Sequence, residues 1–353
     1  MPTLTYLRAH GSPFDVGRQL GEFGAAAMQA YARSSPAWAA VMRHRGAPAA
    51  ESMAAMVRER FPGIWSELQG LAAGLGMPDE DVFLWNCRGD LWAMAPDGCT
   101  TVQQPGAQSR RITHNEDGDP AFADHCAIVE CAVDGGASFA SFVYPGSLPG
   151  HTFAVTGRGL AMTVNNLRSL KIDAGIPRMV LTRAILEAAS LQEATELLRA
   201  APRAGGFHLT LAHVASPRLL SVEFNTTVCS VMDVAARSLH ANHAVHPALR
   251  GLPQIVTGSS RHRQERGEAL LKHEGSAAID PLTLLGDQAD AAFPIHRTAP
   301  DDSDIENTMA TADIRIGPQR IEWRVHEQPH LPARFHMIDG HANPQTPTGE
   351  RDP

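Results

Sequence analysis

The stretch Ala95-Pro-Asp-Gly-Cys-Thr-Thr-Val-Gln103 marks the point at which the character of the sequence changes. Before it, apolar residues recur three, four or seven positions apart, a spacing typical of helices that bury one face. Examples are Met53, Met56, Val57, Ile64, Leu68 and Leu71. After it, short apolar runs alternate with turn-forming residues, which favours strands. The chain therefore divides into a helical first part and a strand-rich second part.

Working outward, the pattern predicts further elements on both sides of this junction. Helices are expected up to about residue 95, with a chain reversal at 76–81 and a short helix over 82–91, then a helical pair within 178–201 and a helix over 260–272. Strands are expected at 99–103, 111–115, 126–133, 139–144, 153–165 with a break at 157–159, 208–214 and 219–232. This order predicts a layered α+β domain, and the stretch from about residue 341 is expected to be a frayed tail.

Composition excludes several classes of function. The 353 residues are 43% hydrophobic, which is enough for a sizeable core. With 30 Lys+Arg against 38 Asp+Glu, the net charge of −8 gives no electrostatic attraction for nucleic acid or an anionic membrane. The first ten residues lack a secretory signal, and no apolar run is long enough to span a bilayer. We therefore expect a cytoplasmic protein without nucleic-acid or membrane partners.

Among the five cysteines, Cys99 stands at the helix-to-strand junction, directly after a turn that ends in Gly98. A hairpin between 99–103 and 111–115 places Cys99 opposite the region of Asn115, Glu116 and Asp117, so we expect an amide and a carboxylate beside the thiol. A thiol with an ordinary pKa needs a nearby base to become a nucleophile. No histidine stands in the right place, because His114 should point to the face opposite Asn115.

One solution is that the base is the α-amino group of Cys99 itself. This requires Cys99 to be the first residue of a chain, so the sequence predicts cleavage of the Gly98–Cys99 bond. A glycine before the cysteine suits such a cleavage, because it tolerates strained backbone conformations and leaves its carbonyl open to the thiol. The other interpretation of Cys99 is a small buried residue that begins a strand.

Several segments, in this order, resemble the penicillin acyltransferase type of N-terminal-nucleophile hydrolases, the group that contains acyl-coenzyme A:6-aminopenicillanic acid acyltransferase. The resemblance runs from about residue 11 to 329. It is carried by Gly11-Ser-Pro-Phe-Asp-Val-Gly-Arg-Gln-Leu-Gly-Glu, Leu68-Gln-Gly-Leu-Ala-Ala-Gly-Leu-Gly, Trp85-Asn-Cys-Arg, Gly98-Cys-Thr-Thr, His114-Asn-Glu-Asp117, Gly175-Ile-Pro-Arg, His240-Ala-Asn-His243 and Ser259-Ser-Arg-His-Arg.

The resemblance implies a four-layer αββα sandwich cut into a helical α chain, residues 1–98, and a β chain, residues 99–353, which stay associated as one domain. Cys99 takes the place of the nucleophile and its freed amine that of the base. Asp117 matches the acidic residue that orients the cysteine. Asn242 matches the asparagine that donates to the oxyanion. The pair Asn165 and Asn166 matches asparagines that line the acyl pocket, although polar residues that end a strand would look the same.

Two departures from the family pattern concern the substrate. Glu116 replaces an aromatic residue that often precedes the aspartate, and an arginine often found before the last strands has no clear match near Asn307-Thr308-Met309. The resemblance implies hydrolysis of a small N-acyl amide through a thioester, with coenzyme A-dependent acyl transfer as the alternative. No cofactor is expected, and a homo-oligomer is left open.

Other interpretations compete with this one. His240, His243 and His246 could ligate a metal ion, although their spacing by three does not keep side chains on one face of a strand. We expect no metal and expect His243 to hold Asn242 by hydrogen bonding. Arg261 could bind a substrate carboxylate or phosphate, or simply begin a solvated helix. A relative that only binds a ligand is the remaining class.

Overall fold

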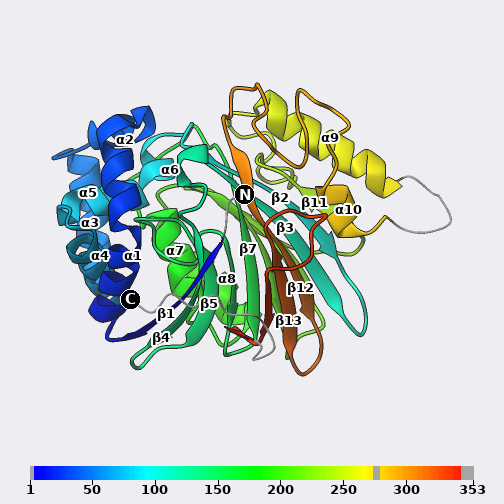
Figure 1. Cartoon of the computed structure of the whole chain (residues 1–353), viewed down its shortest axis with the longest axis horizontal. Coiled ribbons are helices and arrows are strands. Elements are labelled where there is room, and N and C mark those ends of the chain that lie inside the picture. Colours follow the sequence, from blue (N-terminus) through cyan, green and yellow to red (C-terminus); the bar gives the residue numbers. More distant parts are fainter. Residues whose placement is uncertain (1–3, 273–278, 343–353) are drawn as a thin grey trace.

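The computed structural model describes residues 4–272 and 279–342, and it has the mixed α+β architecture that the sequence predicts. Two β-sheets lie face to face with helices on their outer sides (Figure 1). In the described part of the chain, no helix combines the length and apolar character needed to cross a membrane. Most of the expected tail lies outside the described residues.

The first sheet has eight strands in the order β1-β4-β5-β6-β7-β8-β9-β10. From β4 onward each strand pairs antiparallel with the next, so the strands β4 to β10 form a meander, whereas β1 pairs parallel with β4. The prediction of one continuous strand over 219–232 is wrong. Asn225 Oδ1 accepts hydrogen bonds from two backbone N–H groups in a turn, and the segment forms a hairpin of two strands, β9 and β10. The strands are Thr5–Gly11, Ala127–Val133, Ser138–Val143, Phe153–Thr156, Leu160–Asn166, Phe207–His213, Leu219–Phe224 and Cys229–Asp233.

The second sheet has seven strands in the order β11-β2-β3-β12-β13-β14-β15. The expected hairpin at the junction is β2 (Asp97–Gln104) and β3 (Arg110–Gly118), and it lies inside this sheet. Strands β1 and β11 and the last four strands were not predicted. The remaining members are β11 (Ser238–His240), β12 (Asn307–Ile316), β13 (Ile321–His326), β14 (Phe335–Ile338) and β15 (His341–Ala342).

Helices cover the outer face of each sheet (Figure 1). Helix α1 packs on β1 and β4, α8 packs on β8, and α9 and α10 pack on the second sheet. Four of the early helices begin with proline, whose fixed φ suits the first helical position. The helices are α1 (Pro13–Ser34), α2 (Pro36–Met42), α3 (Pro48–Arg60), α4 (Pro62–Leu75), α5 (Asp79–Asn86), α6 (Arg88–Leu91), α7 (Arg178–Ile185), α8 (Leu191–Ala200), α9 (Gly258–Lys272) and α10 (Pro281–Leu285).

The glycines of α1 and α4 let the two helix backbones touch. A Cβ at Gly17 would lie 1.9 Å from the carbonyl oxygen of Glu67, and one at Gly70 would lie 2.0 Å from that of Phe14. These distances are too short for any side chain, and backbone atoms cannot move aside as a flexible side chain can. The two glycine-rich segments that carry the family resemblance are therefore the two halves of one helix contact.

Replacing Gly70 with alanine should destabilise the fold, because the new methyl group must push α4 away from α1. The expected loss in the free energy of unfolding is about 1–3 kcal/mol, as for other overpacked sites. Urea unfolding measures it. Gly251→Ala is the matched control, since a Cβ there meets no atom within 4 Å, and an equal loss in both variants would contradict the packing argument.

Candidate active site

The register of the β2–β3 hairpin decides which side chains surround Cys99. Cys99 pairs with Glu116, Gly98 pairs with Asp117, and Thr101 pairs with His114. Because alternate residues of a strand share a face, Glu116 and His114 lie on the face of the Cys99 side chain, whereas Asn115 and Asp117 lie on the other. Cys99 itself is buried and lies near the start of β2, where the helical first part of the chain ends and the strand-rich part begins.

A line of hydrogen bonds leads away from the thiol. Cys99 Sγ lies 3.7 Å from Glu116 Oε2, which lies 3.1 Å from His114 Nε2. His114 Nδ1 in turn lies 2.8 Å from Thr101 Oγ1. His114 does point away from Asn115, as expected, but the conclusion that no histidine serves the thiol is wrong. The thiol lies on the face of His114, and Glu116 connects them.

Burial controls the charge of this group. It raises the pKa of the Cys99 thiol well above its ordinary value, and the nearby carboxylates of Glu116, Asp117 and Asp97 raise it further. Burial also raises the pKa of the Glu116 carboxyl well above its usual range and lowers the pKa of His114 to about 3. Burial therefore favours the neutral form of all three side chains.

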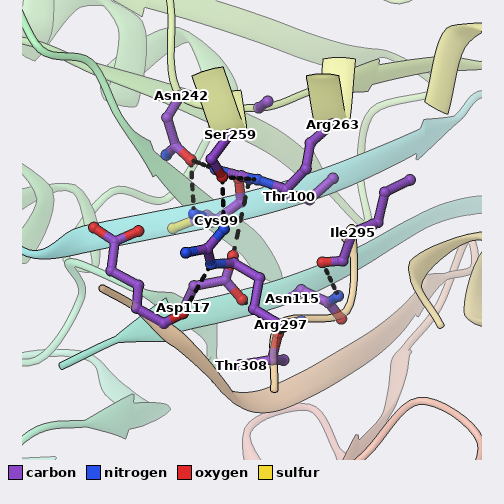
Figure 2. A network of polar contacts seen from close by, with 12 residues as sticks. Cys99, Thr100, Asn115, Asp117, Asn242, Ser259, Arg263, Ile295, Arg297 and Thr308 are labelled. Carbon is purple, nitrogen blue, oxygen red and sulfur yellow. Dashed lines mark hydrogen bonds and ion pairs between the residues drawn. The ribbon is translucent and has the colours of Figure 1, made fainter. Parts of the chain in front are cut away.

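The backbone of Cys99 is held from the other side by Asn242 and Arg263. The Cys99 N–H donates to Asn242 Oδ1 at 3.0 Å. Arg263, from α9, donates at 2.7 Å to the Cys99 carbonyl oxygen, to Thr100 Oγ1 and to Asn242 Oδ1. Figure 2 shows this guanidinium beside β2, between Thr100 and Asn242. The side-chain nitrogen of Asn242, Nδ2, donates to the Asn166 carbonyl oxygen at 3.3 Å.

Asp117 lies across the strand pair from Gly98, on the face opposite the thiol. Its Oδ1 accepts from Thr308 Oγ1 at 2.7 Å, and its Oδ2 lies 3.8 Å from Arg263 Nη1 (Figure 2). Burial raises the pKa of the Asp117 carboxyl, while Arg263 and Arg297 lower it. The structure thus brings Asp117 to the Gly98–Cys99 junction and to the same arginine that holds the cysteine backbone.

Position 98 requires a glycine because there is no room for a side chain. Gly98 is not among the glycines with positive φ, so its backbone does not use the left-handed region that glycine alone adopts readily. A Cβ at this position would lie 2.0 Å from Glu306 Oε2. Burial raises the pKa of Glu306 to about 8, and its Oε1 accepts from Arg168 at 3.0 Å. A carboxyl group that sequence reasoning missed therefore packs directly against the junction.

The three other asparagines are engaged within the protein. Asn165 Oδ1 accepts from Thr101 and His208, and Asn166 spans Asp97 and Arg178. These contacts favour the interpretation of the pair as polar groups that join strand ends. Asn115 donates at 2.9 Å to the Leu285 carbonyl oxygen and accepts from Thr311, so its side chain is directed away from the thiol.

The arginine of this site is Arg263. Arg261 is exposed at the start of α9, whereas Arg263 is completely buried. The helical period could have distinguished them, since Ser259, Arg263 and Gly267 recur every four residues and all three face the protein interior. Arg297, which bonds Ser259 and Asp302, is a second buried arginine that the sequence did not reveal.

The histidines near residue 240 serve separate partners. His240 Nε2 lies 2.8 Å from Glu223 Oε1, and His246 lies between Ser221 and Ser230. His243 contacts Ser260 Oγ, which accepts from the Asn242 N–H, so His243 supports Asn242 through this serine and not directly. Among the residues with described positions, the group spaced closely enough for a metal ion is Cys99, His114 and Glu116, and hydrogen bonds already account for that arrangement.

A cavity of about 320 Å³ lies beside the Asp117 side of the site. Thr308 connects the two, because it lines the cavity and also bonds Asp117. The other lining residues mix apolar and polar groups: Leu4, Phe122, Ala123, Asp124, Cys126, His296, Arg297, Thr298, Ala299, Asn307, Met309, Glu327 and Gln328. The volume is within the range of pockets that bind small organic molecules.

Arg263→Met should destabilise the protein far more than Arg261→Met. Removing one partner from a buried charge cluster typically costs about 3–5 kcal/mol, whereas an exposed substitution stays within about 0.5 kcal/mol. Urea unfolding of the two variants, which differ by two positions in one helix, measures the contrast. Equal stabilities would refute the assignment of Arg263 as the cation that holds this site together.

Comparison with known proteins identifies the family of the chain. A family model described as acyl-coenzyme A:6-aminopenicillanic acid acyl-transferase matches residues 104–329, well over half of the 353-residue chain. The match includes Glu116, Asp117, Asn242 and Arg263 and begins shortly after Cys99. A search of curated proteins finds no match. The chain belongs to the acyl-coenzyme A:6-aminopenicillanic acid acyl-transferase family, whose enzymes are N-terminal-nucleophile acyltransferases and hydrolases.

Proposed function

We propose that the protein cleaves its own Gly98–Cys99 bond and then acts as an N-terminal-cysteine amidohydrolase on a small N-acyl amide. In this proposal the two sheets and their outer helices form the αββα sandwich of such enzymes, with residues 1–98 and 99–353 as its associated chains. The observation that carries the proposal is the 3.0 Å bond from the Cys99 nitrogen to Asn242 Oδ1. The nitrogen that must become the catalytic base is already anchored by a polar side chain.

The surroundings of this nitrogen suit a base. After cleavage this nitrogen would be an α-amine. Asn242 Oδ1 can accept a hydrogen bond from one of the N–H groups of the amine and so fix the direction of the amine's lone pair. The guanidinium of Arg263, which bonds both the Cys99 carbonyl oxygen and Asn242, places a positive charge nearby. A neighbouring cation disfavours protonation of an amine, and a neutral amine can take the thiol proton.

The chemical steps then follow from these positions. The Cys99 sulfur attacks the amide carbonyl carbon while its proton passes to the α-amine, and the amine gives that proton to the departing amine. The oxyanion accepts from the Asn242 side-chain amide, whose present bond to Asn166 is long at 3.3 Å, and from backbone N–H groups. Water resolves the acyl-thioester, or a second amine does so in the acyl-transfer alternative.

The cavity beside Thr308 is our candidate for the acyl pocket, because one of its lining residues, Cys126, lies near Glu116 and so brings the cavity to the thiol face of the hairpin. It is the largest of the described cavities, and one hydrogen bond separates it from Asp117. Its mixed lining suits an acyl group with both apolar and polar parts. Transfer from coenzyme A would use the same acyl-enzyme, formed from an acyl-coenzyme A thioester with release of the coenzyme A thiol and resolved by an amine in place of water.

Cys99→Ala should leave one uncut chain without turnover, because both steps use the sulfur. The wild-type protein should give pieces of about 10.5 and about 27.4 kDa, the shares of the 37.9 kDa chain held by residues 1–98 and 99–353. Denaturing gels and N-terminal sequencing test this. Active wild-type material that never begins with Cys-Thr-Thr-Val would rule out the mechanism, and so would activity in Cys99→Ala.

Asn242→Ala should lower kcat of cut protein by about 10²–10³, the usual effect of removing one oxyanion donor. KM should change less, because the lost bond forms mainly in the transition state. Hydrolysis of a panel of N-acyl amides, followed by release of the amine, measures both constants. The control is His243→Ala, which alters the support of Asn242 through Ser260 and should have a smaller effect on kcat. A larger effect at His243 than at Asn242 would contradict the assignment.

A further inference from the structure

Self-cleavage poses a problem that the mature mechanism does not solve. Before the cut, the Cys99 nitrogen belongs to a peptide bond and donates to Asn242, so it has no lone pair with which to accept a proton. The thiol is buried and resists ionisation. The first step therefore needs another proton acceptor, one that touches the sulfur in the uncut chain.

The structure places a carboxyl group in that position. Glu116 Oε2 lies 3.7 Å from Cys99 Sγ, within hydrogen-bond range for sulfur, and Glu116 is the direct β-ladder partner of Cys99. The backbone N–H of Asn166 also faces the sulfur and favours its thiolate form. The thiol thus has a proton acceptor on one side and a donor that stabilises the resulting charge.

The hydrogen bonds behind Glu116 determine where its proton lies. Asn165 Nδ2 donates to the His240 carbonyl oxygen at 3.0 Å, so Asn165 Oδ1 must be an acceptor. Thr101 Oγ1 donates to this oxygen at 2.7 Å and can then only accept from His114 Nδ1. His114 Nε2 consequently carries no proton and accepts one from Glu116 Oε2 at 3.1 Å. Glu116 is therefore a protonated carboxyl that lies between the Cys99 thiol and the unprotonated Nε2 of His114.

We infer that Glu116, backed by His114, is the proton relay that activates Cys99 for cleavage of the Gly98–Cys99 bond. The inference rests on the proposed function, of which it describes the first step. Glu116 contacts the reacting sulfur and is a catalytic residue for this step, while His114 acts through it. The relay is separate from the α-amine, which exists only after the cut.

The step balances as a double proton transfer. As the sulfur bonds to the Gly98 carbonyl carbon, its proton passes to Glu116 Oε2, and the proton already on Oε2 passes to His114 Nε2. The carbonyl electron pair moves onto oxygen. When the C–N bond breaks, His114 Nε2 returns its proton to Glu116 Oε2. The proton that came from the sulfur passes from Oε2 to the Cys99 nitrogen. The products are a Gly98 thioester and a free α-amine, and water then hydrolyses the thioester.

The charges around Glu116 are consistent with a carboxyl that starts protonated. Burial is the main cause that raises the pKa of the Glu116 carboxyl, and the nearby negative charges of Asp97 and Asp117 raise it further. The other titratable groups near it are Cys99, Cys126, Tyr144 and His114. A permanently ionised Glu116 would be unfavourable here, whereas a group that holds a proton and passes it on keeps the site neutral.

The test follows cleavage of the newly synthesised full chain over time by intact mass, with EDTA present so that metal ions play no part. Glu116→Gln keeps the shape of the side chain but cannot take the thiol proton, and it should slow cleavage by about 10²–10⁴, the range for general acid–base catalysis. His114→Gln should slow it as well. Glu67→Gln, another buried glutamate that pairs with Arg183 far from Cys99, should cut at the wild-type rate.

Hydroxylamine distinguishes the step that fails. It cleaves thioesters, so it should speed the wild-type reaction and leave a hydroxamate on Gly98, but it should not restore Glu116→Gln, in which the thioester does not form. In Glu116→Ala, formate should restore part of the rate by occupying the vacated space. This arm decides the outcome if Glu116→Gln folds poorly.

Each result bears on one claim. Cleavage of Glu116→Gln or His114→Gln within about twofold of wild type would overturn the relay, since a lost proton acceptor must cost far more. Rescue of Glu116→Gln by hydroxylamine would overturn it too, because Glu116 would then act in thioester hydrolysis. A wild-type chain that never cuts would instead refute the proposed function itself.

Discussion

The buried guanidinium of Arg263 is the interaction on which the site depends. It comes from α9, and it bonds the Cys99 carbonyl oxygen, Thr100 Oγ1 and Asn242 Oδ1 at one point. One side chain thereby joins an outer helix, a central strand and the loop after β11. Such a cation is tolerated in the interior because Asp117 and the neighbouring acidic residues offset its charge. The position of the nucleophile's backbone follows from this contact, and the position of its sulfur follows from the strand register.

The site separates two functions onto the two faces of one hairpin. The face that carries Asp117 meets Arg263, Arg297 and the cavity, and it is rich in charge. The face that carries the thiol meets Glu116, His114 and the polar side chains of the first sheet. Alternation along β3 is enough to create this division, because neighbours in sequence point to opposite sides. Glu116 and Asp117 are adjacent in sequence, yet they belong to different environments.

Much of this could be predicted from the sequence, and the failures have physical causes. The change of periodicity at Gly98 singled out Cys99 and separated the helical first part from the strands that follow. Strand β1 was missed because its parallel partner, β4, lies more than a hundred residues away. The face of His114 was predicted correctly, but its link to Cys99 required the register, which places Glu116 and not Asn115 opposite the thiol. Arg297 and Glu306 reach the site through loop and strand contacts that leave no periodic signal.

Strand β1 has a consequence for the protein as an assembly. It forms one edge of the eight-stranded sheet and pairs along its whole length with β4, while α1 lies across both strands. A break before Cys99 would therefore sever the chain without dividing its core, and the shorter piece would behave as a permanent subunit. Once unfolded, the two pieces would have to find each other by diffusion. Regain of structure would become a bimolecular process whose rate depends on concentration, so the molecule would fold easily only once, before it is cut.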